Sequence, residues 1–430
     1  MSLFETQLPD GLRWVTVRDF YEVTRKPRNL SRPESGLVPF IPMERISQDG
    51  SFEAACLQKP ADSITSGTYF ERGDILVAKI TPSFENGKQA LVEELSNSFG
   101  YATTEVIPLH AKGERQDHRV LFYYLLHSDV RSHVAGKMEG STGRQRVPEG
   151  VLLDLPFPEF EDAEQKAIAD ALELVQSSIR AEHDAFKGCQ ELRQTAMRVL
   201  FTRGLRGELQ KATDIGDVPE SWNIVSLSSV ARIERGRFLH RPRNEPRFYG
   251  GATPFIQTGD VVRSRGRLTE FSQTLNEDGV AISRVFPKGT ILLTIAANIG
   301  YTGILGIEAA CPDSLVAITP SDAVDVLFLE YFLQTQQPVM DQRAPKGTQK
   351  NINIQFLNPW PVPLPDVEEQ REIAAILDAI DQKIDLHRQK KAVLEELFRT
   401  LLHKLMTGEV RVSDLDLSAL ETASAVEMTV

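Results

Sequence analysis

The sequence predicts an α+β protein with two duplicated β-rich domains separated by two long helices, which pair as an antiparallel coiled coil with pseudo-twofold symmetry. Three observations predict this fold class. A proline-led helix start, PLPDVEEQREIAAILDAI from Pro363, returns in weaker form as PFPEFEDAEQKAIADALEL from Pro156. The regions before the two helices are also alike. Both helices carry apolar residues at alternating four- and three-residue spacing, which is typical of a coiled-coil seam.

The repeat divides the chain into segments. Setting Gln165 on Gln370 aligns the two helices without a gap to their ends, and the long period excludes a solenoid, whose repeats are far shorter. The last residues have weak apolar content and are predicted to be disordered. The predicted segments are a first β-rich domain at 1–155, a central helical spacer at 156–205, a second β-rich domain at 206–362, a C-terminal helical spacer at 363–410 and a disordered tail at 411–430.

Each β-rich domain opens and closes in the same way. LPDGLRWVTVRDF from Leu8 resembles VPESWNIVSLSSV from Val218, and FERGDILVAKI from Phe70 resembles FPKGTILLTIA from Phe286. Each domain then has a short apolar helix, VLFYYLLHS or VLFLEYFLQ, and a glycine-led polar loop, GSTGRQRV or GTQKNINI. The chain is therefore predicted to be one unit duplicated.

The two long helices are predicted to pair with each other. An isolated helix cannot bury so narrow an apolar stripe alone, and the obvious mate within the chain is the other copy. At the polar midpoint of the seam, Glu182 is expected to face Lys391, a kind of pair that sets register more than stability. His387, also at the midpoint, is interpreted as solvated or paired. The predicted seam residues are Ile168, Leu172, Ile179 and Leu200 in the first helix and Ile373, Leu377, Ile384 and Leu405 in the second.

Composition excludes several classes of protein. The formal net charge of −12 argues against a protein that coats nucleic acid nonspecifically. The N-terminus lacks a basic region followed by an apolar core, so a cytoplasmic protein is expected. The most apolar run, from Thr290, is interrupted by glycines and polar residues, so no membrane span is expected. Cys56, Cys189 and Cys311 lie far apart, which supports neither disulfides nor a zinc site.

Catalytic motifs are missing from the sequence. It contains no phosphate-binding glycine loop with lysine, no GxGxxG after a strand, no HExxH and no GxSxG. Glu71, Asp74 and Lys79 would suit the metal site of a nuclease, but the second copy carries neither the acids nor the lysine. The segment is therefore interpreted as a turn and a buried strand, and no catalytic residue or metal site is predicted.

Arginine is concentrated between Arg232 and Arg267, where aromatic residues are interleaved with it. Arginine suits bidentate contacts to guanine edges or phosphates, although a solvated surface patch is the alternative. Both glycine-led loops are also basic, but the sequences around them differ. Duplicated scaffolds with different loops are what a protein needs to read two different DNA sequences, and a rigid spacer would fix the distance between them.

The sequence resembles the specificity subunits of type I restriction-modification systems. The resemblance covers nearly the whole chain and rests on LPDGLRW and VPESW, GDIL and GTIL, GTQKNI, PLPDVEEQREIAAILDAIDQKI and LMTGEV. It implies two target-recognition domains, each reading one half of a split DNA target, and a coiled coil that sets the gap. It also implies that the helices dock modification (methyltransferase) subunits, two in number, and through them the restriction (ATP-dependent translocase and nuclease) subunits.

The resemblance further implies a non-catalytic chain that binds no cofactor, with S-adenosylmethionine, ATP and Mg²⁺ held by the partner subunits. A coiled-coil adaptor without DNA reading is one alternative, and a nuclease or methyltransferase in its own right is another. The resemblance implies that basic residues in the loops face double-stranded DNA. They are Arg28, Lys79, Lys88, Arg144 and Arg146 in the first domain and Arg237, Arg241, Arg263, Lys346 and Lys350 in the second.

Overall fold

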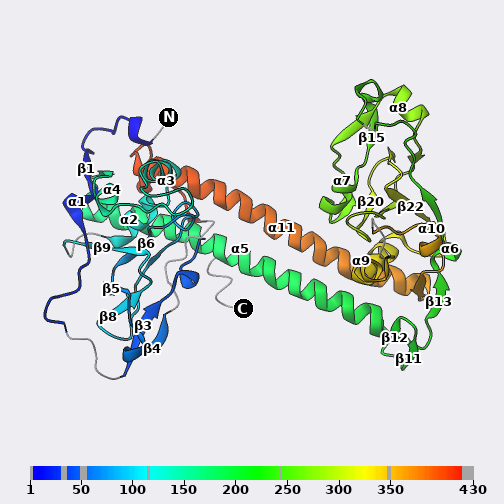
Figure 1. The fold of residues 1–430 in the computed structure, drawn as a ribbon, viewed down its shortest axis with the longest axis horizontal. Helices are drawn as coiled ribbons and strands as arrows, with labels where there is room; N and C mark the ends of the chain where they lie inside the picture. The colour runs from blue at the N-terminus through cyan, green and yellow to red at the C-terminus, as the bar shows by residue number, and fades with distance from the viewer. Residues whose placement is uncertain are drawn as a thin grey trace. The chain divides into compact units, whose positions relative to one another are not determined.

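The computed structural model describes residues 3–30, 36–48, 56–113, 117–242, 244–345 and 350–418. The chain forms two compact units, each of which takes in part of both long helices. Unit 1 consists of Met1–Ala185 and His387–Val430, and unit 2 consists of Phe186–Leu386. Figure 1 follows the chain through them by colour.

Unit 1 is built on a four-stranded antiparallel sheet that is buried on both faces. Along its strand β6 (Ile75–Ala78), Ile75 and Val77 enter a core with the helices, whereas Leu76 between them packs toward a second sheet. Successive side chains of a strand point to opposite faces, so a continuous apolar run is what a doubly covered strand requires. The strands are β2 (Tyr21–Val23), β9 (Val106–Ala111), β6 (Ile75–Ala78) and β7 (Gln89–Leu91), in that order across the sheet.

The second sheet of unit 1 lies against the first through Ile41, Phe70 and Ala102. Its strands β3 (Leu37–Ile41) and β8 (Phe99–Ala102) run parallel, and its other pairs of strands are antiparallel. The strands are β4 (Leu57–Pro60), β3 (Leu37–Ile41), β8 (Phe99–Ala102) and β5 (Thr68–Glu71), in that order. The helices of the β-rich part are α1 (Val17–Phe20), α2 (His118–Tyr124), α3 (Ser128–Ala135) and α4 (Glu149–Leu153).

Unit 2 repeats this topology. Its first sheet has the order β14 (Ala231–Arg235), β22 (Leu315–Pro320), β19 (Ile291–Thr294), β20 (Thr302–Leu305), and adds β16 (Gly266–Leu268) parallel to β20. Its second sheet has the order β17 (Gln273–Leu275), β15 (Tyr249–Phe255), β21 (Ala309–Ala310), β18 (Val285–Phe286). As in unit 1, the central pair of the second sheet, β15 and β21, is parallel. The helices are α6 (Leu227–Val230), α7 (Thr258–Arg263), α8 (Glu277–Ala281), α9 (Val326–Arg343) and α10 (Ile354–Leu357).

Short two-stranded ribbons lead into the long helices. Proline-rich strands enter each helix, as the sequence indicated, because proline stops a strand and restricts the residue before it. The ribbons pair β1 (Trp14–Thr16) with β10 (Pro156–Pro158) and β13 (Asn223–Ser226) with β23 (Pro361–Leu364). The helices are α5 (Asp162–Arg203) and α11 (Val367–Met406), and a hairpin of β11 (Gln210–Thr213) and β12 (Gly216–Pro219) follows α5.

The two long helices pack antiparallel within each unit. In unit 1, Ile168 near the start of α5 shares a core with Leu405 near the end of α11. In unit 2, Leu200 near the end of α5 shares a core with Ile373 near the start of α11. The eight residues proposed for the seam are all buried, at most 8% exposed. The predicted fold class, with duplicated β-rich parts and a pair of long helices, is confirmed.

The polar midpoint of the helix pair differs from the expectation. In unit 1, Glu182 lies 2.6 Å from Nδ1 of His387 and 3.3 Å from Nζ of Lys390. The Nζ atom of Lys391 instead lies 3.3 Å from Nδ1 of His183. The expected pairing of Glu182 with Lys391 is therefore wrong. Residues three and four apart share one helix face, so the seam spacing does not determine which of them meets the partner's carboxylate.

The segment after α11 is only partly described. A short 3-10 helix spans Val412–Asp414, and Val412 and Leu415 pack against the core of unit 1. Most of the tail for which disorder is predicted, residues 419–430, lies outside the described residues.

Candidate nucleic-acid interface

In unit 1, the loop after β6 meets the basic glycine-led loop. Ile80 and Arg146 form an isolated antiparallel bridge. The Val147 N–H donates to the Lys79 carbonyl (2.8 Å), and the Thr81 N–H donates to the Gln145 carbonyl (3.0 Å). These backbone bonds bring two distant segments, residues 79–88 and 139–147, into one structure, which we call the first loop pair.

Unit 2 contains the equivalent arrangement. The loop after β19 bridges the end of its glycine-led loop between Ala296 and Asn351, and the Ile352 N–H donates to the Ile295 carbonyl (2.9 Å). Residues 295–301 and 350–352 form the second loop pair. The duplication has therefore preserved a backbone scaffold at the same place in both units, although the side chains on it differ.

The predicted basic residues gather around the first loop pair, where they are partly neutralised. Arg146 is exposed and binds Glu105 through two hydrogen bonds, of 3.0 and 2.8 Å. The hydrogen bond from Arg146 lowers the pKa of the Glu105 carboxyl, and the charges of Arg146 and Lys79 contribute. Arg144 is exposed, and its side chain has no hydrogen-bond or ion-pair partner among the described residues. The unpaired guanidinium of Arg144 therefore lies two residues from that of Arg146, which Glu105 partly neutralises.

The other two predicted residues of unit 1 lie in different settings. Lys88, at the end of the same loop, is half-buried and its ammonium donates to the Met43 carbonyl (2.8 Å). Arg28 is exposed in a turn that follows β2, without a partner among the described residues. Lys88 therefore tethers its loop, whereas Arg28 is free to reach a ligand.

In unit 2, the predicted basic residues are bound to neighbouring acids and carbonyls. Arg237 donates to the Ser283 carbonyl (2.8 and 3.2 Å), and Arg241 pairs with Asp313 (2.9 Å). Such pairs on exposed side chains are weak and can exchange for a phosphate at little cost. Arg263 pairs with the buried Asp260 (2.6 Å), Lys350 pairs with Asp341 (2.7 Å), and Lys346 lies outside the described residues.

The acids that would suit a nuclease have a structural role. The Asp74 carboxylate accepts a hydrogen bond from the Glu71 N–H (2.8 Å) and lies 2.7 Å from Nδ1 of His110. Gly73 beside it has a left-handed φ of 87°, as a tight turn requires, and β6 is buried throughout. Among the described residues, no cluster of three His, Cys, Asp or Glu could hold a metal ion. In that same part of the chain, no helix has the length and apolarity needed to span a membrane.

Sequence reasoning missed the role of the glutamine that aligned the two copies. Gln165 and Gln370 are both buried near the starts of α5 and α11. Gln165 accepts from the Asp117 N–H (3.1 Å), and Gln370 accepts from the Asp325 N–H (2.7 Å). Asp117 caps the N-terminus of α2, and Asp325 caps the N-terminus of α9. Each glutamine therefore fixes the β-rich part of its unit to a long helix. The sequence signal for this role was the recurrence of the glutamine at matching positions of the two copies.

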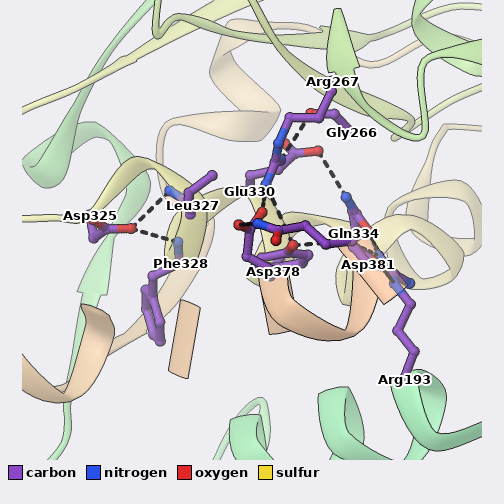
Figure 2. A network of polar contacts seen from close by, with 12 residues as sticks. Arg193, Gly266, Arg267, Asp325, Leu327, Phe328, Glu330, Gln334, Asp378 and Asp381 are labelled. Carbon is purple, nitrogen blue, oxygen red and sulfur yellow. Dashed lines mark hydrogen bonds and ion pairs between the residues drawn. The ribbon is translucent and has the colours of Figure 1, made fainter. Parts of the chain in front are cut away.

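A polar network in unit 2, shown in Figure 2, was also missed. Arg193 on α5 donates to Asp381 on α11 and to Gln334 on α9 (2.6 Å to Gln334). Arg267 on β16 donates to Asp378 on α11 (2.7 Å). The network joins both long helices to β16, the edge strand of the first sheet of unit 2.

Glu330 lies at the buried centre of this network. Its Oε1 accepts hydrogen bonds from Thr302 and Gln334 (3.0 Å each). Its Oε2 is buried and has no hydrogen-bond partner among the described residues. Burial raises the pKa of the Glu330 carboxyl to about 7. The site therefore favours the neutral acid over the carboxylate.

Comparisons with known proteins agree on one family. The family model for the type I restriction modification DNA specificity domain matches residues 219–396. The type I restriction enzyme MjaVIII specificity subunit of Methanocaldococcus jannaschii is 25% identical over 338 residues, which cover 74% of this chain and 76% of that protein.

Two solved structures share the fold. The type I restriction-modification system S subunit from M. genitalium superposes with a TM-score of 0.59 at 16% identity, covering 93% of this chain and 98% of that one. A chain from a structural study of complex assembly and conformational transition of the type I R-M system superposes with a TM-score of 0.57 at 22% identity, covering 94% and 100%.

Proposed function

We propose, because this chain belongs to the specificity subunits of type I restriction-modification systems, that it selects the DNA sequence on which such a system acts. The observation that carries the proposal is the duplicated loop pair. Both units place a loop from the sheet against a basic glycine-led loop, yet they display different side chains. Each unit reads one half of a split target, by base contacts in the groove and phosphate contacts that set position.

The paired helices have two tasks in this proposal. They set the number of base pairs between the half-sites, and they dock the modification subunits, two for each chain. Large apolar side chains on them support the docking task, because Leu192, Leu386 and Val393 are each at least half exposed. Exposed apolar residues on an otherwise charged helix suit a protein partner.

We assign the chemistry to the partner subunits. S-adenosylmethionine is used by the modification subunits, and ATP and Mg²⁺ by the restriction subunits that join through the complex. The specificity chain contributes recognition and assembly, and it acts where the DNA lies, in the cytoplasm. The predicted basic residues Arg28 and Arg144, which are exposed and unpaired in the described structure, are the first candidates for phosphate contacts.

Co-expression with the modification subunit of its own system tests the proposal. The host lacks other DNA methylation, and methylated bases are mapped across the genome. We expect one split motif with a fixed gap. A stable co-purifying complex that methylates no defined motif would instead support an adaptor without sequence reading.

Replacing Glu105 with glutamine is expected to strengthen binding to DNA. The substitution frees Arg146 for a phosphate and removes one negative charge from the first loop pair. One extra phosphate contact raises affinity about two- to fivefold at low salt and steepens the slope of log K against log salt by roughly 0.9. A salt titration of the assembled complex measures both, with the exposed Glu94→Gln as the control. Weaker binding by Glu105→Gln would show that the pair orients Arg146 productively.

A further inference from the structure

The loop between β19 and β20 contains a strained residue. Ala297 has a φ of 61°, in the left-handed region, and the Asn298 N–H donates to the Ala296 carbonyl (2.8 Å). This combination is a tight γ-turn, which is rare and costs free energy for any residue other than glycine. Such strain persists only where the surroundings enforce it, and it concentrates at functional positions.

The base of this loop is rigidly held. The Thr294 hydroxyl donates to the Asn298 carbonyl and accepts from the Tyr301 N–H (3.0 Å). From α9, Gln337 donates to the carbonyl of the buried Ile299 (2.9 Å). Together with the bridge to Asn351, these bonds enforce the γ-turn and fix the backbone of its tip.

The tip presents two polar side chains to solvent. Asn298 is exposed, and Tyr301 is 40% exposed. Neither side chain has a hydrogen-bond partner among the described residues. Both are uncharged, so they are suited to base edges more than to phosphates. An asparagine amide can form a bidentate pair with the N6 and N7 atoms of adenine, and a tyrosine ring can pack against a neighbouring base.

Unit 1 holds its equivalent loop in the same way but displays other residues. Gly87 occupies the place of Gly300 just before the next strand, and the two have left-handed φ values of 85° and 81°. Arg131 donates to the Phe84 carbonyl (2.6 Å), as Gln337 does to Ile299 in unit 2. The shared scaffold therefore fixes the loop, whereas its tip varies between the units.

We propose that residues 296–301 are a base-reading loop, in which Asn298 recognises an adenine of the half-site read by unit 2 and Tyr301 packs against the adjacent base pair. The inference rests on the proposed function and goes beyond it, because it assigns the reading to uncharged residues outside the arginine-rich segment. The strained turn fixes the backbone of Asn298 before DNA arrives, which reduces the entropy lost on binding.

The experiment uses the complex assembled with its modification subunit. Binding is measured on DNA in which each base pair of each half-site is replaced in turn. Asn298→Ala and Asn298→Asp are expected to lose discrimination at one A·T pair of one half-site, by about 5- to 150-fold, and to leave the other half-site unchanged. Tyr301→Ala is expected to weaken the neighbouring position, whereas Tyr301→Phe retains most of the effect of the ring.

Two controls separate reading from folding. Asn223→Ala removes another exposed asparagine of unit 2, on β13, and is expected to change discrimination at no position. Ala297→Gly relieves the strain while the surrounding hydrogen bonds keep the same turn, so thermal stability should rise with little change in discrimination. Unchanged discrimination in both Asn298 variants, or equal losses in both half-sites, would overturn the inference while the proposed function stands. A wild-type complex without any split motif would overturn the proposed function instead.

Discussion

Replacing Leu377 with alanine is expected to lower the free energy of unfolding of unit 2 by about 2–5 kcal/mol. Leu377 is fully buried on α11 and shares a core with Leu200 of α5 and with Phe328 of α9. Truncation removes apolar contacts and leaves a cavity between three helices. These helices are fixed by other contacts, so the cavity cannot close fully.

Urea unfolding followed by tryptophan fluorescence measures this loss. Trp222 and Trp360 lie in the same core as Leu377, so they report on the unit that the substitution affects. Leu386→Ala is the matched control, because Leu386 lies on the same helix and is 50% exposed. We expect the control to change stability by less than about 0.5 kcal/mol. Equal losses in the two variants would contradict the helix packing described here.

The duplicated architecture was predictable because the sequence carries it twice. The matching segments from Phe70 and Phe286 each became a positive-φ turn followed by a fully buried strand, β6 or β19. The seam of the helices was predictable for a related reason, since a narrow apolar stripe has few partners that can cover it. The partner of Glu182 was not predictable, because His387, Lys390 and Lys391 share one face of α11.

The candidate interface was predictable only in part. Basic residues in the glycine-led loops could be counted in the sequence, but the bridge that joins Arg146 to Ile80 depends on the pairing of distant backbone segments. The acids that neutralise these residues, such as Glu105 and Asp313, also lie far away in the chain. The strain at Ala297 has no sequence signal, because alanine is an ordinary residue in most conformations.

The network around Glu330 has a consequence for stability at different pH values. Burial raises the pKa of this carboxyl from 4.5 to about 7 in the folded protein. Between those values the folded state binds a proton that the unfolded state releases, so folding stability falls as pH rises from about 4.5 to about 7. Arg267 and Arg193 oppose the shift through their charges, and the hydrogen bonds from Thr302 and Gln334 oppose it as well.

Replacing Glu330 with glutamine is therefore expected to remove this loss. From pH 5 to pH 8, the wild type should lose about 2–3 kcal/mol of unfolding free energy relative to Glu330→Gln. Urea unfolding of both proteins at several pH values measures this difference. The contributions of groups that titrate alike in both proteins cancel in it. The exposed Glu308→Gln serves as the matched control and should show a constant difference from wild type. A difference that does not vary with pH for Glu330→Gln would mean that Glu330 is already ionised at pH 5, with its Oε2 satisfied by water.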